Sequence, residues 1–500
     1  MQNAETKPAR SVKTFFHSSF IIHRSAFVLL ALLALVLRLP QLGSRPMHTD
    51  EAINAYMAGQ LLAGERYHYD PQDRHGPALM ELTLPVLRLE GARNYAELTE
   101  SQLRLVTVLV GSATVLLFGA AVEMLGFIPC LVAALLFAFA PLPAYYSRYF
   151  IHETVFVAAT LGLIVAGGRA WQKCFPPAAA LAGFCTAGML ACKETAGLHF
   201  VALGLAVALG WRLRALGKIP PVRIWLTALI SFLLTGILLF TWGGQNWSAL
   251  ADLIRAVPHL AARASGEGHE KPCWYYLGLL AGGWSGAIIL ALALLGIFRA
   301  TGSFLRLSLA AYAILIYGVY CVIPYKTPWL ALNFWLPISL LAGFAVERLW
   351  LATTKPSLRA VILSGGIVIG CLVAHDTRER VFLNPIAEKN PYAYSHTTDD
   401  LLGLPVRLDE LSRQNNLSSP RIAVIAKDAW PLPWYLRQFP AVGYWQPGQD
   451  PGAADFYITT TDVPDALAEK LKPFRPEFFG VRLNVLLILW TPPKAEAGHE

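Results

Sequence analysis

Charged residues are scarce in this sequence. Only 15% of the 500 residues are Asp, Glu, Lys or Arg, whereas 55% are hydrophobic. Soluble domains carry roughly 25% charged residues, so the composition excludes an ordinary soluble protein and predicts an integral membrane protein. The net charge of +8 does not indicate a nucleic-acid partner, because the basic residues are spread over short loops between apolar runs.

Other patterns are missing as well. The seven cysteines include no Cys-x-x-Cys pair, so they supply neither a disulfide framework nor a metal motif. The first apolar run, Ala26 to Leu39, follows a basic tail, but no small-x-small cleavage site comes after it. We therefore expect an uncleaved membrane anchor and not a secretory signal.

Eleven apolar runs predict transmembrane helices, since a bilayer core about 30 Å thick takes roughly 17 to 25 residues per helix. The expected spans are 25–41, 103–122, 127–145, 154–168, 177–191, 195–211, 223–241, 274–298, 306–323, 329–347 and 359–374.

Basic residues predict the orientation of these spans in the inner (plasma) membrane. With the N-terminal tail in the cytoplasm, the alternate loops on that side carry Arg169, Lys173, Arg212, Arg214, Lys218, Arg223, Arg299, Arg348, Lys355 and Arg359. This distribution obeys the positive-inside rule. An odd number of spans then places the chain from His375 onward outside the cytoplasm.

The same count brings five polar loops to the outer face: "HTDEA", "YSRYFIHET", "CKET", "GHEKPCWYY" and "YKTPW". Charged residues near membrane depth cost roughly 2.5 to 3.5 kcal/mol each, so they are rarely kept without a partner or a function. We expect a polar, outward-facing cavity among the helices.

The last 125 or so residues are more polar and richer in turn residues. "RIAVIA" (421–426), "FYITT" (456–460) and "VLLILW" (485–490) predict buried strands, and "WPLPWYLRQF" and "DALAEKL" predict short helices. The predicted fold is an all-α polytopic membrane domain, residues 1–374, followed by a small extracytoplasmic α/β domain with its linker, residues 375–500.

Asp50 and Glu51 follow the first span and begin a helical pattern. One interpretation is a helix N-terminus, where Thr49 or Asp50 caps the helix and acidic residues favour the dipole. The other is a general base at the mouth of the cavity, which removes a proton from an attacking hydroxyl.

The other outer loops offer further candidates for substrate binding. Arg148 fits an interfacial role beside tyrosines, but Glu153, next to His152, needs a cation, a metal or a substrate hydroxyl. Lys193 and Glu194 interrupt an apolar stretch; they form either an internal ion pair or a contact for an anionic headgroup. His269, Glu270, Lys271 and Lys326 add charge on the same side.

Oxygen ligands from Asp50, Glu51 or Glu153 would suit Mg²⁺ or Mn²⁺, but their spacing specifies no metal. His75 in "RHGP" is interpreted as a loop or headgroup contact and not as a ligand.

The chain resembles the membrane glycosyltransferases of the GT-C fold, especially the branch of protein O-mannosyltransferases and lipid A aminoarabinose transferases. The resemblance rests on "HTDEAINAYMAGQLLAG", "RHGPALMELTLPVLRL", "SQLRLVTVLVGSATVLLFG" and "YSRYFIHE". "GHEKPCWYY", "YKTPWLALNFWLP" and "WPLPWYLR" resemble most a subgroup named flippase-activity-associated proteins.

This resemblance implies a sugar donor on a polyprenyl phosphate and transfer, with inversion, to a protein, lipid or glycan on the outer face. Asp50 matches the catalytic acid of the family and Glu51 its neighbour. Glu153 falls near a second acidic position where the family often has Asp. The approximate phosphate contacts are Arg148, Lys193 and Lys326.

Two other functions fit the sequence. A non-catalytic GT-C-like partner of a lipid-linked oligosaccharide flippase would keep the fold without turnover. A secondary transporter would have many spans and intramembrane charges, but transporters show paired repeats and broken helices at the midplane, and no repeat is apparent here.

Overall fold

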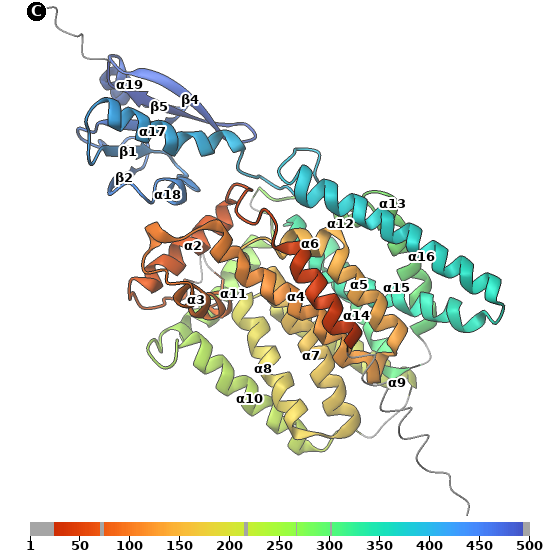
Figure 1. Ribbon diagram of the computed structural model, residues 1–500. Coiled ribbons are helices and arrows are strands. Elements are labelled where there is room, and N and C mark those ends of the chain that lie inside the picture. Colours follow the sequence, from red (N-terminus) through yellow and green to blue (C-terminus); the bar gives the residue numbers. More distant parts are fainter. Residues whose placement is uncertain (1–24, 71–74, 215–218, 267, 301–302, 494–500) are drawn as a thin grey trace, which may run out of the picture. The chain divides into compact units, whose positions relative to one another are not determined.

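The chain divides into two compact units. The computed structural model describes residues 25–70, 75–214, 219–266, 268–300 and 303–493 (Figure 1). Of the described residues, unit 1 holds 25–40, 66–70, 75–82 and the described part of 104–383, and unit 2 holds 41–65, 83–103 and 384–493. The grouping of 41–65 and 83–103 with the C-terminal residues was not expected from the sequence.

Unit 1 is built from apolar helices. Among the described residues, seven helices are long and apolar enough to cross a membrane: α4 (Glu100–Leu125, whose first turn belongs to unit 2), α7 (Glu153–Lys173), α9 (Ala196–Arg214), α10 (Val222–Phe240), α14 (Phe304–Val322), α15 (Leu332–Ala352) and α16 (Pro356–Thr377). Four shorter apolar helices are Ser25–Arg38, α5 (Phe127–Phe139), α8 (Pro176–Cys192) and α13 (Trp284–Arg299). Each of the eleven predicted spans overlaps one of these helices, so the expected polytopic membrane fold is confirmed.

We name the two ends of this helix bundle after α7, which starts at Glu153 and finishes at Lys173. At the Lys173 end, Lys173 pairs with Glu123 in the last turn of α4 at 2.9 Å. Arg306 at the start of α14 donates to the last carbonyl of α4 at 2.6 Å and pairs with Glu347 near the end of α15. Helices α4, α7 and α15 therefore end, and α14 begins, at this end of the bundle.

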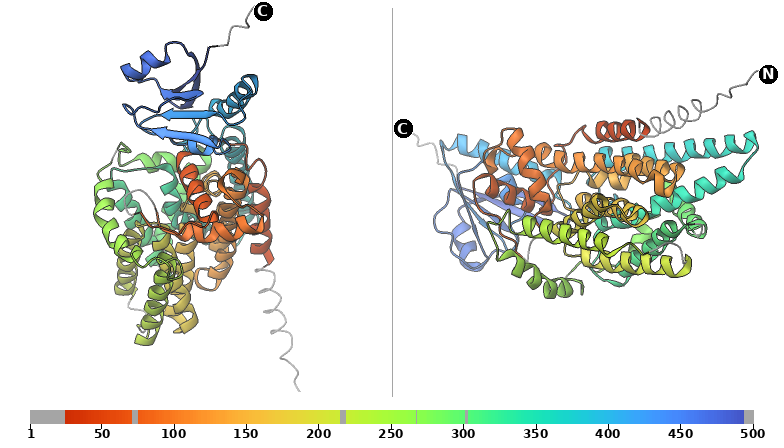
Figure 2. Two further views of the ribbon diagram at one scale, coloured as in Figure 1. Left: turned by 90° about the vertical axis from the view of Figure 1, so that its left-hand side faces the viewer. Right: turned by 90° about the horizontal axis from the view of Figure 1, so that it is seen from below.

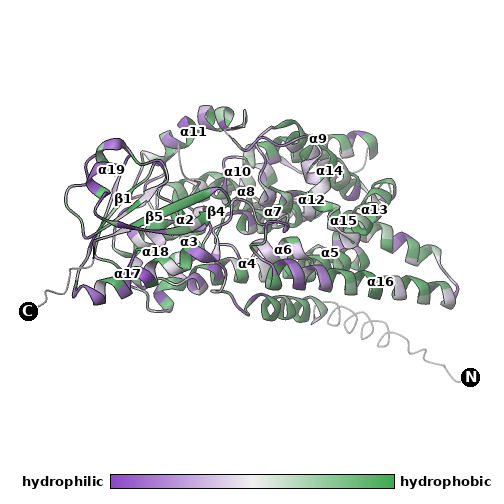
Figure 3. Cartoon of the chain, turned by 90° about the horizontal axis from the view of Figure 1, so that it is seen from above, coloured by the Kyte–Doolittle hydropathy of each residue, from purple (hydrophilic) through white to green (hydrophobic). Residues whose placement is uncertain are grey.

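The bundle presents apolar surfaces outward (Figure 3). Only 6% of the α10 span is buried within the protein, and Leu234 on this helix is 64% exposed. The helices run side by side along the bundle (Figure 2). An apolar exterior of this kind is suited to lipid, in which every backbone group must be satisfied within the helix itself.

Glycines let pairs of these helices approach backbone to backbone. A Cβ on Gly296 of α13 would lie 1.9 Å from the Leu341 carbonyl oxygen of α15, and one on Gly183 of α8 would lie 2.1 Å from the Ala228 oxygen of α10. Lipid supplies no hydrophobic force between helices, so small residues at such contacts allow the close packing that holds them together.

Shorter elements connect the bundle helices. They are α6 (Pro141–Tyr146), α11 (Ala249–Arg263), α12 (Tyr275–Leu280), η3 (Pro328–Ala331) and η4 (Arg378–Leu383). Helix α3 (Ala78–Leu89) has residues in both units.

Unit 2 contains a five-stranded mixed sheet with the order β2-β1-β3-β5-β4. The strands are β1 (Arg421–Ile425), β2 (Ala441–Trp445), β3 (Phe456–Thr460), β4 (Arg475–Arg482) and β5 (Val485–Thr491). Strand β1 is parallel to β2 and β3, whereas β5 is antiparallel to β3 and β4. The predicted α/β fold is confirmed, but the sequence analysis missed β2 and β4.

The helices of unit 2 are α2 (Thr49–Leu62), η1 (Tyr95–Glu97), η5 (Asp399–Leu402), α17 (Gly403–Gln414), α18 (Leu432–Tyr435) and α19 (Asp465–Leu471). The two predicted short helices correspond to α18 and α19. A buried core cluster joins strands β1 and β3 to helix α19. It consists of Ala423, Ile425, Tyr457, Leu467 and Leu471.

The contact between α13 and α15 leads to a prediction. Gly296→Ala should destabilise the protein by about 1 to 3 kcal/mol, because the added Cβ meets backbone that has no room to move. The matched control is Gly236→Ala in α10, whose Cβ would meet nothing within 4 Å; it should be neutral or slightly stabilising. Thermal denaturation in detergent compares the two, and equal midpoints would contradict the packing described.

Candidate active site

The start of α2 in unit 2 holds the adjacent carboxylates Asp50 and Glu51. Glu51 is completely buried and pairs with Arg45 at 3.2 Å. Its side chain also accepts the His48 N–H at 3.1 Å, and the His48 ring in turn accepts a backbone N–H of the first turn, which forms a capping box. The cap is therefore His48 and not Thr49 or Asp50, the residues that the sequence favoured.

Two histidines of unit 2 fix this segment through defined ring tautomers. His396 Nδ1 donates to the Thr397 carbonyl at 2.9 Å, which leaves Nε2 to accept from Arg45 at 3.2 Å. Burial, followed by the charge of Arg45, lowers the pKa of His396 well below 6.5, so the ring is neutral. His48 Nε2 donates to the Tyr394 carbonyl at 3.1 Å, which leaves Nδ1 as an acceptor.

Backbone contacts complete the attachment. The Met47 N–H donates to the Tyr435 hydroxyl at 2.8 Å, and the Thr397 hydroxyl donates to the Met47 carbonyl at 2.6 Å. The turn before α2 is thus held on both sides by residues of the C-terminal part of unit 2.

Asp50 has a different environment from its neighbour. Its side chain is 46% exposed, and its nearest ion-pair contact is His48 Nδ1 at 3.9 Å. Because Nδ1 already accepts the Asp50 N–H, it has no proton to give to the carboxylate. One acid is therefore enclosed and the other is accessible, although the two are adjacent in sequence.

In unit 1, a second cluster of polar side chains lies at the Glu153 end of the bundle. Glu153 and Lys193 form a buried ion pair. Glu194 accepts hydrogen bonds from the Tyr69 hydroxyl at 2.7 Å and from His75 at 3.1 Å. Of the two interpretations of "CKET", an ion pair is present, but the partner of Lys193 is Glu153 and not its neighbour.

Local chain geometry explains why these side chains meet. Helix α8 ends at Cys192 and α9 begins at Ala196, so the turn between them presents Lys193 and Glu194 beside the start of α7. Burial alone would raise the pKa of Glu194, but the hydrogen bonds and charge of His75 and the bond from Tyr69 outweigh it and lower the pKa to about 2. The carboxylate is thus ionised at neutral pH.

His152 belongs to the same cluster. Its ring lies 5.2 Å from that of His75. Burial, followed by the charges of His75 and Lys193, lowers the pKa of His152 well below 6.5. His152 therefore contributes a neutral ring to this cluster.

Two further loops of unit 1 pair with each other. The Lys326 N–H donates to the His269 carbonyl at 3.1 Å, and the Lys271 N–H donates to the Pro324 carbonyl at 3.1 Å. An isolated antiparallel bridge joins Glu270 to Tyr325 between them. The structure thus brings His269, Lys271 and Lys326 together, as the shared side of their loops predicted.

Both groups lie at the same end of the bundle. His199, one turn into α9, contacts the hydroxyl of Tyr320 in the last turn of α14 at 3.2 Å. The start of α9 therefore lies against the end of α14. The loop before α9, which carries Lys193, and the loop after α14, which carries Lys326, are thus at the same end of the bundle.

Arg148 has a structural role in unit 1. Its guanidinium donates to the carbonyls of Arg38 at 2.9 Å and Pro40 at 2.7 Å and lies over the ring of Phe382. It thereby fixes the chain where it leaves the first helix, and its role as a phosphate contact stays a prediction.

The described residues contain no cluster of three His, Cys, Asp or Glu side chains that could bind a divalent metal ion. Asp50 and Glu153, the candidate ligands, belong to different units. We therefore derive no step through a metal.

The sequence analysis missed several residues of these clusters. Tyr69 was not considered, and His75 was interpreted as a loop or headgroup contact and not as a partner of Glu194. In unit 2, Arg45, His48 and His396 were overlooked. A His three residues before Glu51 was an available signal, because that spacing is typical of a capping box.

Comparison with known proteins identifies the fold. No family model matches the chain, and no curated protein matches it in sequence. The crystal structure of ArnT from Cupriavidus metallidurans bound to undecaprenyl phosphate matches with a TM-score of 0.65 over 95% of this chain and 99% of ArnT, at 15% identity.

Two more solved structures agree. AglB, the oligosaccharyltransferase of Archaeoglobus fulgidus in complex with an inhibitory peptide and a dolichol-phosphate, matches with a TM-score of 0.56 over 94% of this chain and 76% of AglB, at 12% identity. The mycobacterial arabinofuranosyltransferase AftD matches at 0.50 over 95% of this chain and 40% of AftD, at 14% identity. The chain is a polytopic membrane protein with the GT-C fold of these glycosyltransferases. Its place in the flippase-activity-associated subgroup stays a prediction.

The Glu194 cluster leads to a prediction. Tyr69→Phe should destabilise the protein by about 1.5 to 3 kcal/mol, because it removes a hydrogen bond to a charged, largely buried carboxylate. Tyr95→Phe is the matched control, since the buried Tyr95 hydroxyl has no hydrogen-bond partner among the described residues; its removal should be neutral or stabilising. Thermal denaturation measures both, and a Tyr69→Phe midpoint equal to that of the wild type would contradict the assignment.

Proposed function

We propose that the protein is an inverting glycosyltransferase that moves a sugar from a polyprenyl phosphate to an acceptor hydroxyl. The observation that carries this proposal is the exposed carboxylate of Asp50 at the start of α2, beside an enclosed Glu51, in a chain with the GT-C fold. A half-exposed carboxylate with no strong partner is suited to act as a general base.

The proposed reaction is a single displacement. The acceptor oxygen attacks the anomeric carbon and forms the new glycosidic bond while the bond from that carbon to the phosphate oxygen breaks. Asp50 takes the proton of the acceptor hydroxyl, and the polyprenyl phosphate leaves with the bonding electron pair. Because a phosphate leaves as a stable anion, no separate acid needs to protonate it.

Cations at the Glu153 end of unit 1 are the candidates for contact with a lipid phosphate. We assign this role to Lys271; Lys326 lies in the paired loop, but its ammonium is buried and donates to the Ile323 carbonyl. Lys193 is already paired with Glu153, so we assign both to positioning. His152, Glu194 and His269 complete the surrounding polar groups.

The membrane side and the substrate class follow from the same proposal. Basic residues at the Lys173 end, including Arg169, Arg212, Arg223, Arg299 and Lys355, favour a cytoplasmic position for that end and for the N-terminus. The Glu153 end and unit 2 would then be extracytoplasmic, in the inner (plasma) membrane. ArnT is bound to undecaprenyl phosphate and AglB to a dolichol-phosphate, which supports a polyprenyl-phosphate donor and a glycan, lipid or protein acceptor.

The two adjacent acids should respond differently to isosteric substitution. Asp50→Asn should lower turnover of a radiolabelled polyprenyl-phosphate sugar about 10²- to 10⁴-fold and leave the thermal midpoint unchanged, since Asp50 is half-exposed. Glu51→Gln should lower the midpoint, because it leaves the Arg45 charge buried without its partner at a cost of about 3 to 5 kcal/mol.

Purified protein in detergent allows turnover and stability to be measured on the same sample. If Asp50→Asn kept full turnover, Asp50 would not be the base. If the wild type showed no turnover of lipid-phosphate sugars while Asp50→Asn left its cellular phenotype intact, the non-catalytic flippase partner would be the better account.

A further inference from the structure

A large apolar cavity lies within unit 1, away from the residues proposed for glycosyl transfer. Its volume is about 750 Å³, and side chains of α7, α8, α9, α10 and α14 line it. Trp171 lies in its wall, 18 residues after Glu153 along α7. At 1.5 Å per residue that separation is about 27 Å, so the cavity belongs to the Lys173 end of the bundle.

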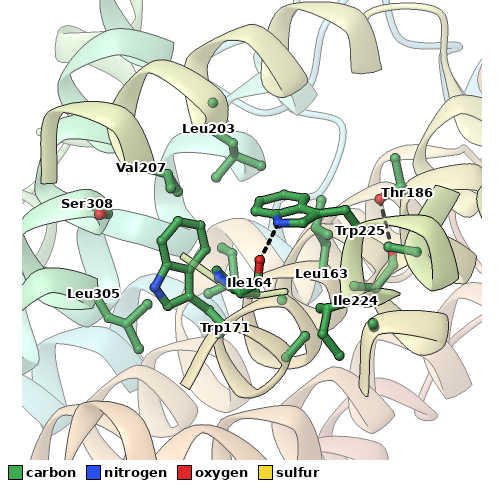
Figure 4. Close-up of a pocket in the computed structure, with 18 of the residues that line it drawn as sticks. Leu163, Ile164, Trp171, Thr186, Leu203, Val207, Ile224, Trp225, Leu305 and Ser308 are labelled. Atoms are coloured by element: carbon green, nitrogen blue, oxygen red, sulfur yellow. Dashed lines mark hydrogen bonds between the residues drawn. The ribbon is translucent and has the colours of Figure 1, made fainter. Parts of the chain in front are cut away.

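Two tryptophans line this cavity. The rings of Trp171 and Trp225 lie among aliphatic side chains in Figure 4, with ring centroids 5.7 Å apart. Trp225 Nε1 donates to the Pro220 carbonyl at 3.1 Å. In contrast, the buried Trp171 Nε1 has no hydrogen-bond partner among the described residues. The Trp171 N–H is enclosed by protein atoms and is not open to the cavity, so the apolar lining and not this donor defines the site.

Positive charge lies next to the lining residues. Arg212 follows Trp211 at the end of α9, and Arg223 precedes Ile224 at the start of α10. Both arginines are exposed. Basic residues where transmembrane helices end attract anionic lipid headgroups, at about 1 kcal/mol for each Lys or Arg near the surface.

We propose that this cavity binds an anionic phospholipid from the leaflet at the Lys173 end. Its acyl chains would fill the apolar space, and the headgroup phosphate would pair with Arg212 and Arg223. The tail of a polyprenyl phosphate fits less well, because a hydrocarbon has no charge for the arginines. The proposal depends on the membrane fold and not on the glycosyl-transfer function.

Filling the cavity tests where the lipid binds. Native mass spectrometry of the purified protein would measure binding of dioleoyl-phosphatidylglycerol. Gly204→Phe should weaken binding on the order of tenfold or more, because Gly204 lines the cavity and the phenyl ring would occupy the space of the acyl chains. The matched control is Gly318→Phe in α14, at a glycine outside the cavity; a Cβ at either position meets nothing within 4 Å.

Replacing the arginines tests headgroup recognition. Wild-type protein should bind dioleoyl-phosphatidylglycerol in preference to dioleoyl-phosphatidylcholine, and Arg212→Gln and Arg223→Gln should each reduce that preference roughly fivefold.

Three results would overturn the proposal. The first is equal binding of phosphatidylglycerol by Gly204→Phe and Gly318→Phe. The second is equal binding of the anionic and zwitterionic lipids by the wild type. The third is displacement of phosphatidylglycerol by uncharged undecaprenol with no effect of the arginine substitutions, which would identify the cavity as a site for an isoprenoid chain.

Discussion

The buried ion pair between Lys193 and Glu153 is the interaction on which the Glu153 end of the bundle depends. Two buried charges are tolerated only when each compensates the other, and removal of one leaves the other without its partner at high cost. The pair fixes the turn between α8 and α9 against the start of α7. With that turn fixed, the Glu194 carboxylate lies within hydrogen-bond distance of Tyr69 and His75. The polar side chains of this cluster therefore remain close to one another.

In unit 2, Glu51 is likewise a buried charge compensated by an ion pair, next to the half-exposed Asp50. Arg45 and the capping box enclose Glu51 and so hold the first turn of α2 in place. Asp50 is left half-exposed at the end of a helix that cannot shift. The base proposed above would lose little conformational freedom when a substrate arrives, as proximity effects in catalysis require. We propose Glu51 as the residue that positions it.

The helices of unit 1 were predictable from the sequence because the lipid bilayer restricts their length and composition. Each of the eleven apolar helices overlaps a predicted span. In the sheet, the three predicted strands, β1, β3 and β5, are the central ones, and most of their residues are apolar. The two missed strands, β2 and β4, form the edges, and β4 carries Arg475, Pro476 and Glu477, a composition typical of edge strands. The sequence could not predict side-chain pairs such as Lys193 with Glu153, because these pairs depend on which helices pack against each other.

The central claim is that the charged loops gather at one end of the bundle and that this end is extracytoplasmic. It is tested most directly by labelling with a membrane-impermeant maleimide in right-side-out vesicles. One variant keeps only the exposed Cys273 beside Lys271, and a second, free of native cysteines, carries Lys355→Cys before α16. The account predicts that Cys273 is labelled in intact vesicles and that the second variant is labelled only after permeabilisation. Labelling of both in intact vesicles, or the reverse pattern, would contradict it.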